Sequence, residues 1–135
     1  MEQGTRHSAV PALRGARVLV VEDDAILLMD LELILREAGA EIVGACRTVE
    51  DALATVRKQP LSIAVLDVRI GGETIAPVVH QLGKHGTPFV FYTGQIGRDP
   101  ALAEWPGSKI VAKPAPGRTI IAAVAEALGE AACWP

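Results

Sequence analysis

The chain has 135 residues, half of them hydrophobic and 21% charged, which suits one globular domain with its own core and argues against wholesale disorder. Its formal net charge of −3 gives no general attraction to a polyanion, so we expect no nucleic-acid partner. No run approaches the ~18 apolar residues of a membrane span, so we expect no membrane partner either.

The cysteines and histidines form no recognisable framework. The two cysteines, Cys46 and Cys133, do not make a disulfide scaffold, and Cys46 follows an apolar run that favours burial. The three histidines lack the spacing of a metal-ligand set. This cysteine usage is typical of a cytoplasmic protein.

Short apolar runs alternate with amphipathic segments through most of the chain. Strands that alternate with helices favour a parallel sheet with helices on both faces and right-handed crossovers. We therefore predict an α/β, doubly wound fold. The alternation divides the chain into a flexible leader (1–15), one domain (16–129) and a short tail (130–135).

The first strand and the first helix show the pattern most clearly. Residues 18–21 form a β-branched run that predicts a strand buried on both faces. Asp24 can cap a helix over 25–38, and Gly39 follows it in the C′ position where helices end. The same pattern predicts strands at 41–46, 63–66, 89–92 and 109–112, and helices at 49–58 (capped by Thr48), at 74–83 (with Pro77 in its first turn) and from 116 or 117 to 128.

Four of the predicted strands run directly into polar residues. Glu22 and Asp23 follow the first strand, Asp67 the third, Thr93 the fourth and Lys113 the fifth. In open α/β sheets, ligands bind beyond the carboxyl ends of the strands. We therefore expect these side chains to converge on one edge of the sheet.

The expected cluster suggests phosphoryl chemistry. Two unit charges ~4 Å apart repel by about 4 kcal/mol at an effective dielectric constant of about 20, so three acids in one site need a cation or Lys113 to offset their charge. Carboxylate oxygens with water suit Mg2+. Thr93 can donate a hydrogen bond to a phosphoryl oxygen, and Lys113 can neutralise another. Asp67 can be the nucleophile that forms an acyl phosphate.

These motifs resemble the receiver domain of two-component response regulators over about residues 16–128. The resemblance rests on VLVVEDD at 18–24, LDV at 66–68, YTG at 92–94 and AKP at 112–114. It implies a CheY-like (flavodoxin-like) (βα)5 fold with the strand order 2-1-3-4-5. It also implies that a histidine kinase or a histidine phosphotransfer protein supplies the phosphoryl group.

The same resemblance assigns roles to single residues. Asp67 would be the phospho-acceptor, Thr93 the switch hydroxyl and Lys113 the phosphate-binding lysine, with a cis peptide between Lys113 and Pro114. The implied Mg2+ ligands are Asp23, Asp67, the backbone carbonyl of Arg69 and, through water, Glu22.

The chain departs from the usual receiver pattern after the fourth strand. Ile110 stands where many receivers carry an aromatic residue that swings inward on phosphorylation. The segment 95–108 contains two prolines and two glycines, so a fourth helix would be short, over about 100–105. Residues 88–95, PFVFYTGQ, resemble the PFxFATG-type motif of stand-alone receivers common in alphaproteobacteria, a subgroup with a reduced or labile fourth helix.

Several residues carry two interpretations. Asp24 is a helix cap or a metal ligand, with the cap favoured. Arg69 and Gln95 either influence dephosphorylation or are solvated side chains. Trp105 either plugs the core under a short helix or contacts a partner. Trp134 is more simply a packing anchor or part of a disordered tail than a functional residue.

The first helix carries two apolar stripes. A core stripe is expected at positions 27, 31, 34, 35 and 38. Ile26, Met29 and Leu33 form a second stripe elsewhere on the helix. A helix that is apolar on two sides usually packs twice, so we expect the second stripe to dock a phosphotransfer partner or a second copy of the chain, with packing inside the domain as the alternative.

The leading hypothesis is a single-domain response regulator. Phosphorylation of Asp67 would draw Thr93 inward and reshape 95–108, and the chain would signal to an unknown downstream protein or act as a phosphate sink. It would catalyse its own phosphorylation and dephosphorylation without being a dedicated enzyme. Three alternatives are a receiver fragment of a larger regulator, a pseudo-receiver that only binds, and a haloacid-dehalogenase-like phosphatase. Members of that phosphatase family normally carry an acid at the position of Arg69.

Overall fold

The structure, a computed structural model, describes residues 10–94 and 99–132. The strands are β1 (Arg17–Val21), β2 (Glu41–Cys46), β3 (Ile63–Leu66), β4 (Arg69–Ile70), β5 (Glu73–Thr74), β6 (Phe89–Thr93) and β7 (Lys109–Ala112). The helices are α1 (Ala25–Glu37), α2 (Val49–Lys58), α3 (Ala76–Lys84), the 3-10 helix η2 (Pro100–Glu104) and α4 (Gly117–Ala132). Among these helices none is both long and apolar enough to cross a membrane.

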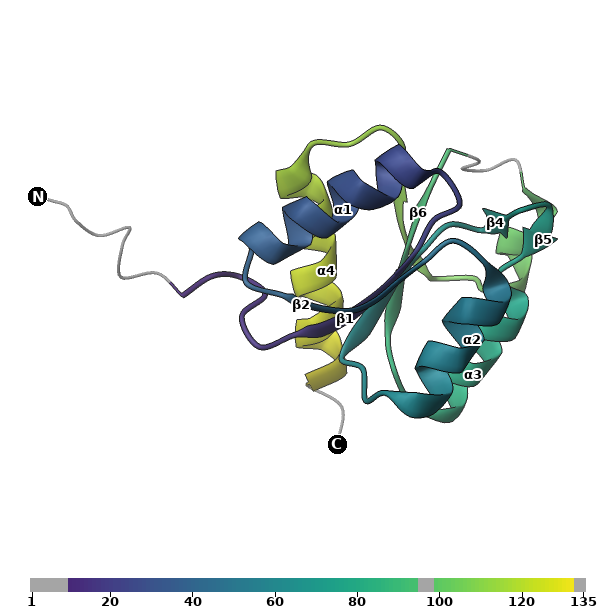
Figure 1. The fold of residues 1–135 in the computed structure, drawn as a ribbon, viewed down its shortest axis with the longest axis horizontal. Coiled ribbons are helices and arrows are strands. Elements are labelled where there is room, and N and C mark those ends of the chain that lie inside the picture. Colours follow the sequence, from purple (N-terminus) through teal and green to yellow (C-terminus); the bar gives the residue numbers. More distant parts are fainter. Residues whose placement is uncertain (1–9, 95–98, 133–135) are drawn as a thin grey trace, which may run out of the picture.

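The main sheet is parallel and confirms the predicted α/β, doubly wound fold. Its strand order is β2-β1-β3-β6-β7, which is the expected order 2-1-3-4-5 when only the main strands are numbered. Helices α1 and α4 cover one face of the sheet, and α2 and α3 cover the other (Figure 1). All four residues of β3 are buried because both faces of this central strand are covered.

The register of the central strands aligns their carboxyl ends. Val21 of β1 pairs with Leu66 of β3, and Leu66 pairs with Phe91 of β6. The residues that follow β1 and β3 are Glu22 and Asp67, so the register places these two acids side by side. The sheet therefore brings together residues that are far apart in the sequence.

Local signals set the ends of the first two helices as predicted. The Asp24 side chain accepts hydrogen bonds from the backbone N–H groups of Ile26 and Leu27, at 2.9 and 3.1 Å. The Thr48 hydroxyl accepts one from the backbone N–H of Asp51 at the start of α2. Gly39 ends the first helix with φ +100, a left-handed conformation that glycine adopts without strain.

The buried face of α1 differs in part from the prediction. Leu28, Leu31 and Leu35 are the buried residues of this helix. Leu27 and Ile34 are only half-buried, although Ile34 still packs against the core. Neighbouring residues on a helix are about 100° apart, so leucines at 27 and 28 both lie near the apolar stripe. The packing of α1 against the sheet and α4 selects Leu28.

Two helix boundaries differ from the predicted ones by more than one residue. Thr74 pairs with Arg69 in the antiparallel β4–β5 hairpin, so α3 begins at Ala76 and not at 74. At the C-terminal end, α4 continues to Ala132 instead of ending at 128. Glu130, in this extra turn, lies 3.5 Å from Lys109 Nζ on β7, which favours the longer helix.

The connection between β6 and β7 contains the expected short fourth helix. It is a single 3-10 segment, η2, whose N-cap Asp99 accepts a hydrogen bond from the Ala101 backbone N–H. Trp105 follows η2 and packs against the core, with its ring centroid 5.5 Å from that of Phe91. This agrees with the interpretation of Trp105 as a core residue under a short helix. Gln95 and Trp134 lie outside the described residues.

Candidate functional site

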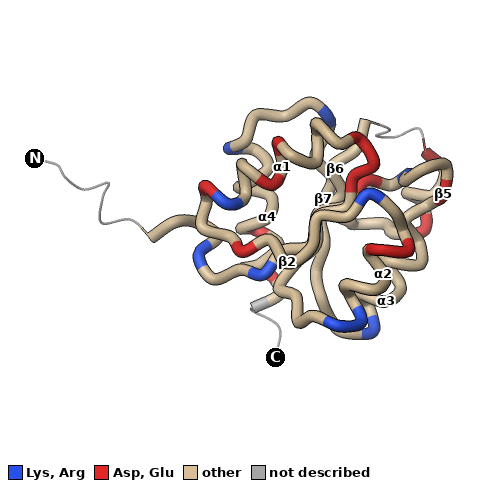
Figure 2. The backbone as a smooth tube through the Cα atoms, in the orientation of Figure 1, with Lys and Arg blue, Asp and Glu red and all other residues tan. Residues whose placement is uncertain are grey.

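The acidic residues meet at the carboxyl edge of the sheet. Glu22, Asp23 and Asp67 each offer one carboxylate oxygen, and these atoms lie within 4.8 Å of one another. In Figure 2 the acids that follow β1 form a red stretch where the strand turns into α1. The three residues come from two strand ends that the register holds side by side, so the predicted convergence is confirmed for this group.

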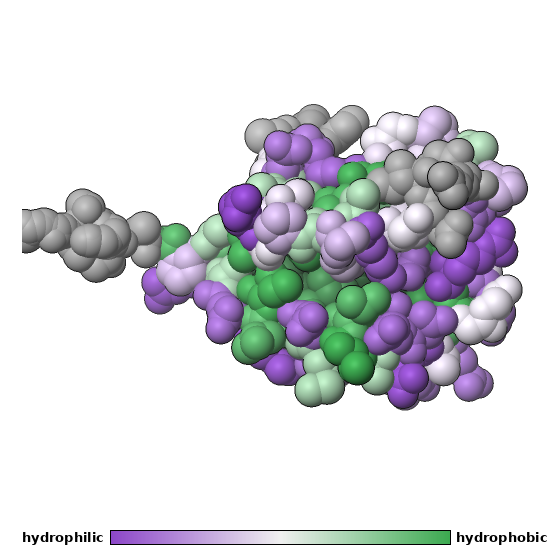
Figure 3. Space-filling view, turned by 90° about the horizontal axis from the view of Figure 1, so that it is seen from above, coloured by the Kyte–Doolittle hydropathy of each residue, from purple (hydrophilic) through white to green (hydrophobic). Residues whose placement is uncertain are grey.

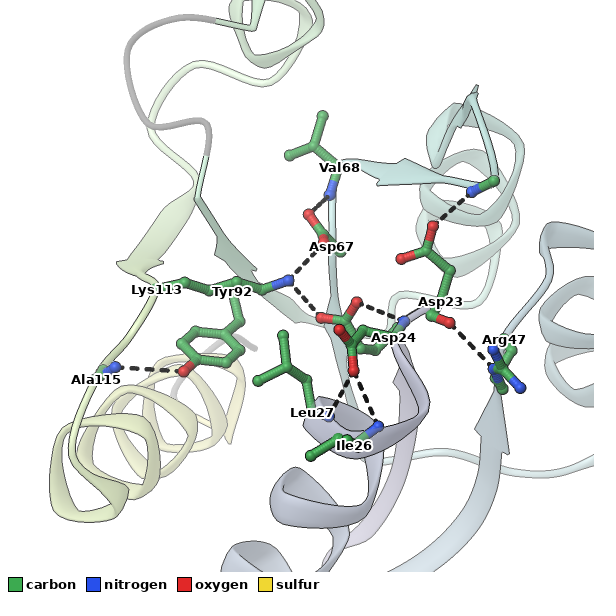
Figure 4. A network of polar contacts seen from close by, with 12 residues as sticks. Asp23, Asp24, Ile26, Leu27, Arg47, Asp67, Val68, Tyr92, Lys113 and Ala115 are labelled. Atoms are coloured by element: carbon green, nitrogen blue, oxygen red, sulfur yellow. Dashed lines mark hydrogen bonds and ion pairs between the residues drawn. The ribbon is translucent and has the colours of Figure 1, made fainter.

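Lys113 joins two of these acids. Its Nζ lies 2.7 Å from Asp67 Oδ2 and also forms a short ion pair with Glu22 Oε1. Figure 4 shows the lysine side chain reaching from the end of β7 toward Asp67. The Lys113–Pro114 peptide is cis, as expected. Since the Glu22 side chain is only 2% exposed, the lysine places a positive charge next to a buried acid.

Asp67 is held from two directions. Its Oδ1 accepts a hydrogen bond from the backbone N–H of Val68 at 2.8 Å, while Oδ2 faces Lys113. The side chain is 12% exposed, so it is mostly sheltered but reachable from solvent. One oxygen is therefore fixed by the backbone and the other by a charge, which orients the carboxylate at the edge of the sheet.

Asp23 is anchored to the β4–β5 hairpin. Its Oδ2 accepts a hydrogen bond from the backbone N–H of Gly71 at 2.9 Å, and its backbone carbonyl accepts one from Arg47 Nε at 3.1 Å (Figure 4). These contacts tie the loop after β1 to the hairpin and to the segment after β2. Asp24, in contrast, points its carboxylate at the first turn of α1, which supports the cap interpretation.

Burial and hydrogen bonds shift the pKa values of three residues in the site. Burial raises the pKa of Glu22 above its ordinary value, although the hydrogen bond from Lys113 acts in the opposite direction. The backbone N–H of Gly71 holds the pKa of Asp23 below its usual range. Burial opposes the charge on Lys113, but its bonds to Asp67 and Glu22 outweigh burial and raise the pKa of the lysine. Lys113 therefore carries its charge at neutral pH.

Thr93 lies at the end of β6, beside the acids. Its side chain is fully buried, and its backbone carbonyl accepts a hydrogen bond from the backbone N–H of Lys113 at 3.0 Å. This bond holds the ends of β6 and β7 together. The structure thus brings Thr93 and Lys113 to the same edge as Asp67, as the sequence predicts.

Arg69 lies just beyond the acids, on β4. Its guanidinium forms two hydrogen bonds with the Asp99 carboxylate, Nε to Oδ2 at 2.7 Å and Nη2 to Oδ1 at 2.9 Å. The side chain is therefore not simply solvated, which was one of its two interpretations. Ligation of a metal by the Arg69 backbone carbonyl stays a prediction.

Sequence reasoning missed three contributors to the site. Tyr92 supports the lysine, because Lys113 Nζ lies 5.7 Å from its ring centroid and the Tyr92 hydroxyl accepts a hydrogen bond from the Ala115 backbone N–H. The other two are Gly71, through its backbone N–H, and Asp99. An Asp before a Pro is a recognisable cap signal, but it does not reveal a partner 30 positions earlier.

The donor set suits a hard divalent cation. Three carboxylate oxygens within 4.8 Å match the oxygen ligands of Mg2+, which usually takes one or two carboxylates and keeps several waters. Lys113 neutralises only part of the negative charge of the three acids. The residues present therefore fit the ion that the fold family implies.

Comparison with known proteins agrees with this geometry. The family model of the response regulator receiver domain matches residues 18–125. The chain is similar to the transcriptional regulatory protein PdtaR of Mycobacterium tuberculosis, with 33% identity over 75 residues that cover 47% of this chain and 37% of that protein. It is also similar to the phyllosphere-induced regulator PhyR of Methylorubrum extorquens, with 26% identity over 117 residues that cover 84% and 44%. The chain spans less than half the length of these curated relatives.

Solved structures show the same likeness. The solution NMR structure of the PhyR receiver domain of Erythrobacter litoralis superposes with a TM-score of 0.77 at 26% identity, covering 87% of this chain and 93% of that one. PhyR of Brucella abortus gives a TM-score of 0.77 at 25% identity, covering 93% and 53%. With a family model that spans most of its length and a sheet of matching topology, the chain belongs to the response regulator receiver domain family.

Proposed function

We propose that this chain is a phosphorylation switch that accepts a phosphoryl group on Asp67 from the phosphohistidine of a histidine kinase or a histidine phosphotransfer protein. The observation that carries the proposal is the Asp67 carboxylate itself. It is partly exposed, lies 2.7 Å from a lysine ammonium and has two further acids within 4.8 Å. This arrangement combines a nucleophile, a cation for the phosphoryl oxygens and a set of metal ligands.

The proposed transfer uses the geometry of the resting site. An Asp67 oxygen attacks phosphorus, the new O–P bond forms as the N–P bond of the donor breaks, and the imidazole nitrogen keeps the electron pair. The Val68 backbone N–H and Lys113 orient the carboxylate for this attack. Lys113 then neutralises a phosphoryl oxygen and the Thr93 hydroxyl donates a hydrogen bond to another. Attack of water on phosphorus returns the carboxylate and releases phosphate.

Asp23, Asp67 and the Arg69 backbone carbonyl would hold Mg2+, with Glu22 acting through water. When bound, the ion would offset the negative charge on the equatorial oxygens of the transferred group. The hydrogen bond from Gly71 orients the Asp23 carboxylate within this set. Glu22 is nearly fully buried and already paired with Lys113, which favours its indirect role over direct ligation.

We assign the exposed stripe of α1 to partner docking. Ile26, Met29 and Leu33 are 73%, 68% and 57% exposed, and α1 begins directly after the acidic residues. Figure 3, which looks down on the molecule from above the view of Figure 1, shows apolar side chains gathered among polar ones. An apolar surface next to the acceptor lets a phosphodonor dock and reach Asp67 in one pose. Homodimerisation through the same stripe is the alternative.

The output of the switch is a change in protein contacts or removal of phosphate from a kinase. Both outcomes require only a receiver domain, whether it acts alone or as part of a larger regulator. The position of Arg69, where a haloacid-dehalogenase-like phosphatase would carry its second acid, holds a guanidinium paired with Asp99. The proposal therefore includes no turnover of free phosphomonoesters.

The decisive experiment is labelling with acetyl phosphate and Mg2+, followed by intact-mass measurement. We expect one base-labile phosphoryl adduct on the wild type and none on Asp67→Asn. Asp30→Asn, which changes an exposed aspartate of α1, is the matched control and should be labelled like the wild type. An adduct that persists in Asp67→Asn would overturn the assignment.

A further inference from the structure

The ion pair between Arg69 and Asp99 links the hairpin after the phospho-acceptor to the 3-10 helix η2. It is bidentate, with N–O distances of 2.7 and 2.9 Å, and its two side chains are unequally covered, at 44% exposure for Arg69 and 4% for Asp99. The hydrogen bond from Arg69 holds the pKa of Asp99 below its usual range, so the acid is charged. A buried carboxylate of this kind depends on its cation to stay stable.

Asp99 also holds η2 in place. Its Oδ1 caps η2 through the Ala101 backbone N–H at 2.9 Å, and Ala101 is buried in the core. At the other end of η2, Trp105 packs on Phe91. The outer side of η2 is exposed at Pro100, among others. The position of this exposed surface therefore depends on Asp99, the buried carboxylate that caps η2.

Arg69 can reach the phospho-acceptor as well as Asp99. From Asp67 to Ile70 burial alternates, with Val68 and Ile70 fully buried and Asp67 and Arg69 partly or largely exposed. The chain bends at Val68, between the end of β3 and the start of β4. Two residues of chain span at most about 7 Å, so the Asp67 carboxylate lies within the reach of the Arg69 side chain.

We propose that Arg69 exchanges partners, pairing with Asp99 in the resting state and with the phosphoryl group when Asp67 is phosphorylated. The inference rests on the proposed function and adds the regulation of that site. A phosphoryl group brings a charge of about −1.5 to −2, more than the single charge of Asp99. Departure of the guanidinium leaves Asp99 buried without its cation, so η2 loosens and its outer surface changes. The switch thus needs no aromatic residue at Ile110.

Amide hydrogen exchange over residues 100–105, measured with and without acetyl phosphate and Mg2+, tests whether Arg69 changes its partner. In the wild type, phosphorylation should raise exchange in this segment by about tenfold, since a charge-assisted pair is lost. In Arg69→Gln the rate should already be raised in the resting state and should change less than about threefold on phosphorylation. Arg36→Gln, which removes an exposed arginine–glutamate pair in the last turn of α1, is the control and should keep the wild-type response.

Asp99→Asn provides a second variant that keeps the helix cap but removes the buried charge. Asparagine also caps helices well, so η2 should stay protected in both states, within about threefold of the resting wild type. The inference is overturned if the phosphorylated wild type keeps its resting protection, or if Arg69→Gln responds like the wild type. Intact mass, recorded on the same samples, separates this failure from absence of the adduct, which would overturn the proposed function itself.

Discussion

Replacing Lys113 with methionine tests how the acidic site is stabilised in the absence of metal. The lysine side chain is 17% exposed, and its two partners, Glu22 and Asp67, are 2% and 12% exposed. Removing one partner of a buried ion pair costs about 3–5 kcal/mol, because the remaining charge stays buried without compensation. Asp67 is partly reachable by water, so we expect the lower end, about 3 kcal/mol. For a domain of this size the melting temperature should fall by about 10 °C.

The assay is urea unfolding in EDTA, with Lys109→Met, at the start of the strand that Lys113 follows, as the matched control. Lys109 pairs with Glu126 and Glu130, whose side chains are 65% and 63% exposed, so its loss should cost about 1 kcal/mol or less. Adding Glu22→Gln to Lys113→Met should recover at least half of the lost stability, because it removes the buried charge. The reasoning fails if the two lysine variants are equally stable, or if Glu22→Gln gives no recovery.

Three further predictions concern the elements that carry the site. Leu28→Ala should lower the free energy of unfolding in urea by about 2–5 kcal/mol, because Leu28 is buried. Leu33→Ala, on the exposed stripe, should change it by about 0.5 kcal/mol or less and should slow phosphotransfer from a donor protein. Equal stability losses would contradict the assigned helix face. Asp24→Ala should cost about 1 kcal/mol and Asp24→Asn clearly less, which thermal melts would show. Gly39→Ala should lose about 1 kcal/mol or more, because φ is +100 and an added Cβ would lie 2.9 Å from Pro11 Cβ; an unchanged melting temperature would refute this.

Much of the fold could be predicted because its signals are local. The apolar runs of β2, β3 and β7 have the predicted bounds, and α2 begins and ends where Thr48 and the periodicity place it. The acids at the ends of β1 and β3 could be assigned to one site because parallel strands present their carboxyl ends together. Each of these inferences uses a short stretch of sequence and one general rule of packing.

Other features depend on contacts that no local pattern records. The pair of Arg69 and Asp99 joins residues 30 positions apart, and the β4–β5 hairpin displaces the start of α3. The support that Tyr92 gives Lys113 likewise appears only when β6 and β7 lie side by side. Such contacts depend on how helices and strands are placed relative to one another in space, and a local sequence pattern does not specify that placement.

The sequence by itself determined the kind of fold and the edge where the polar residues gather, and it singled out Asp67 as the aspartate that we propose as acceptor. It could do so because hydrophobic periodicity, helix caps and residues at strand ends are encoded within a few positions of one another. The tertiary structure alone decided that Leu28 and not Leu27 faces the core, and that Arg69 has a buried anionic partner. Both depend on which surfaces meet when helices pack on the sheet, and periodicity leaves that choice open.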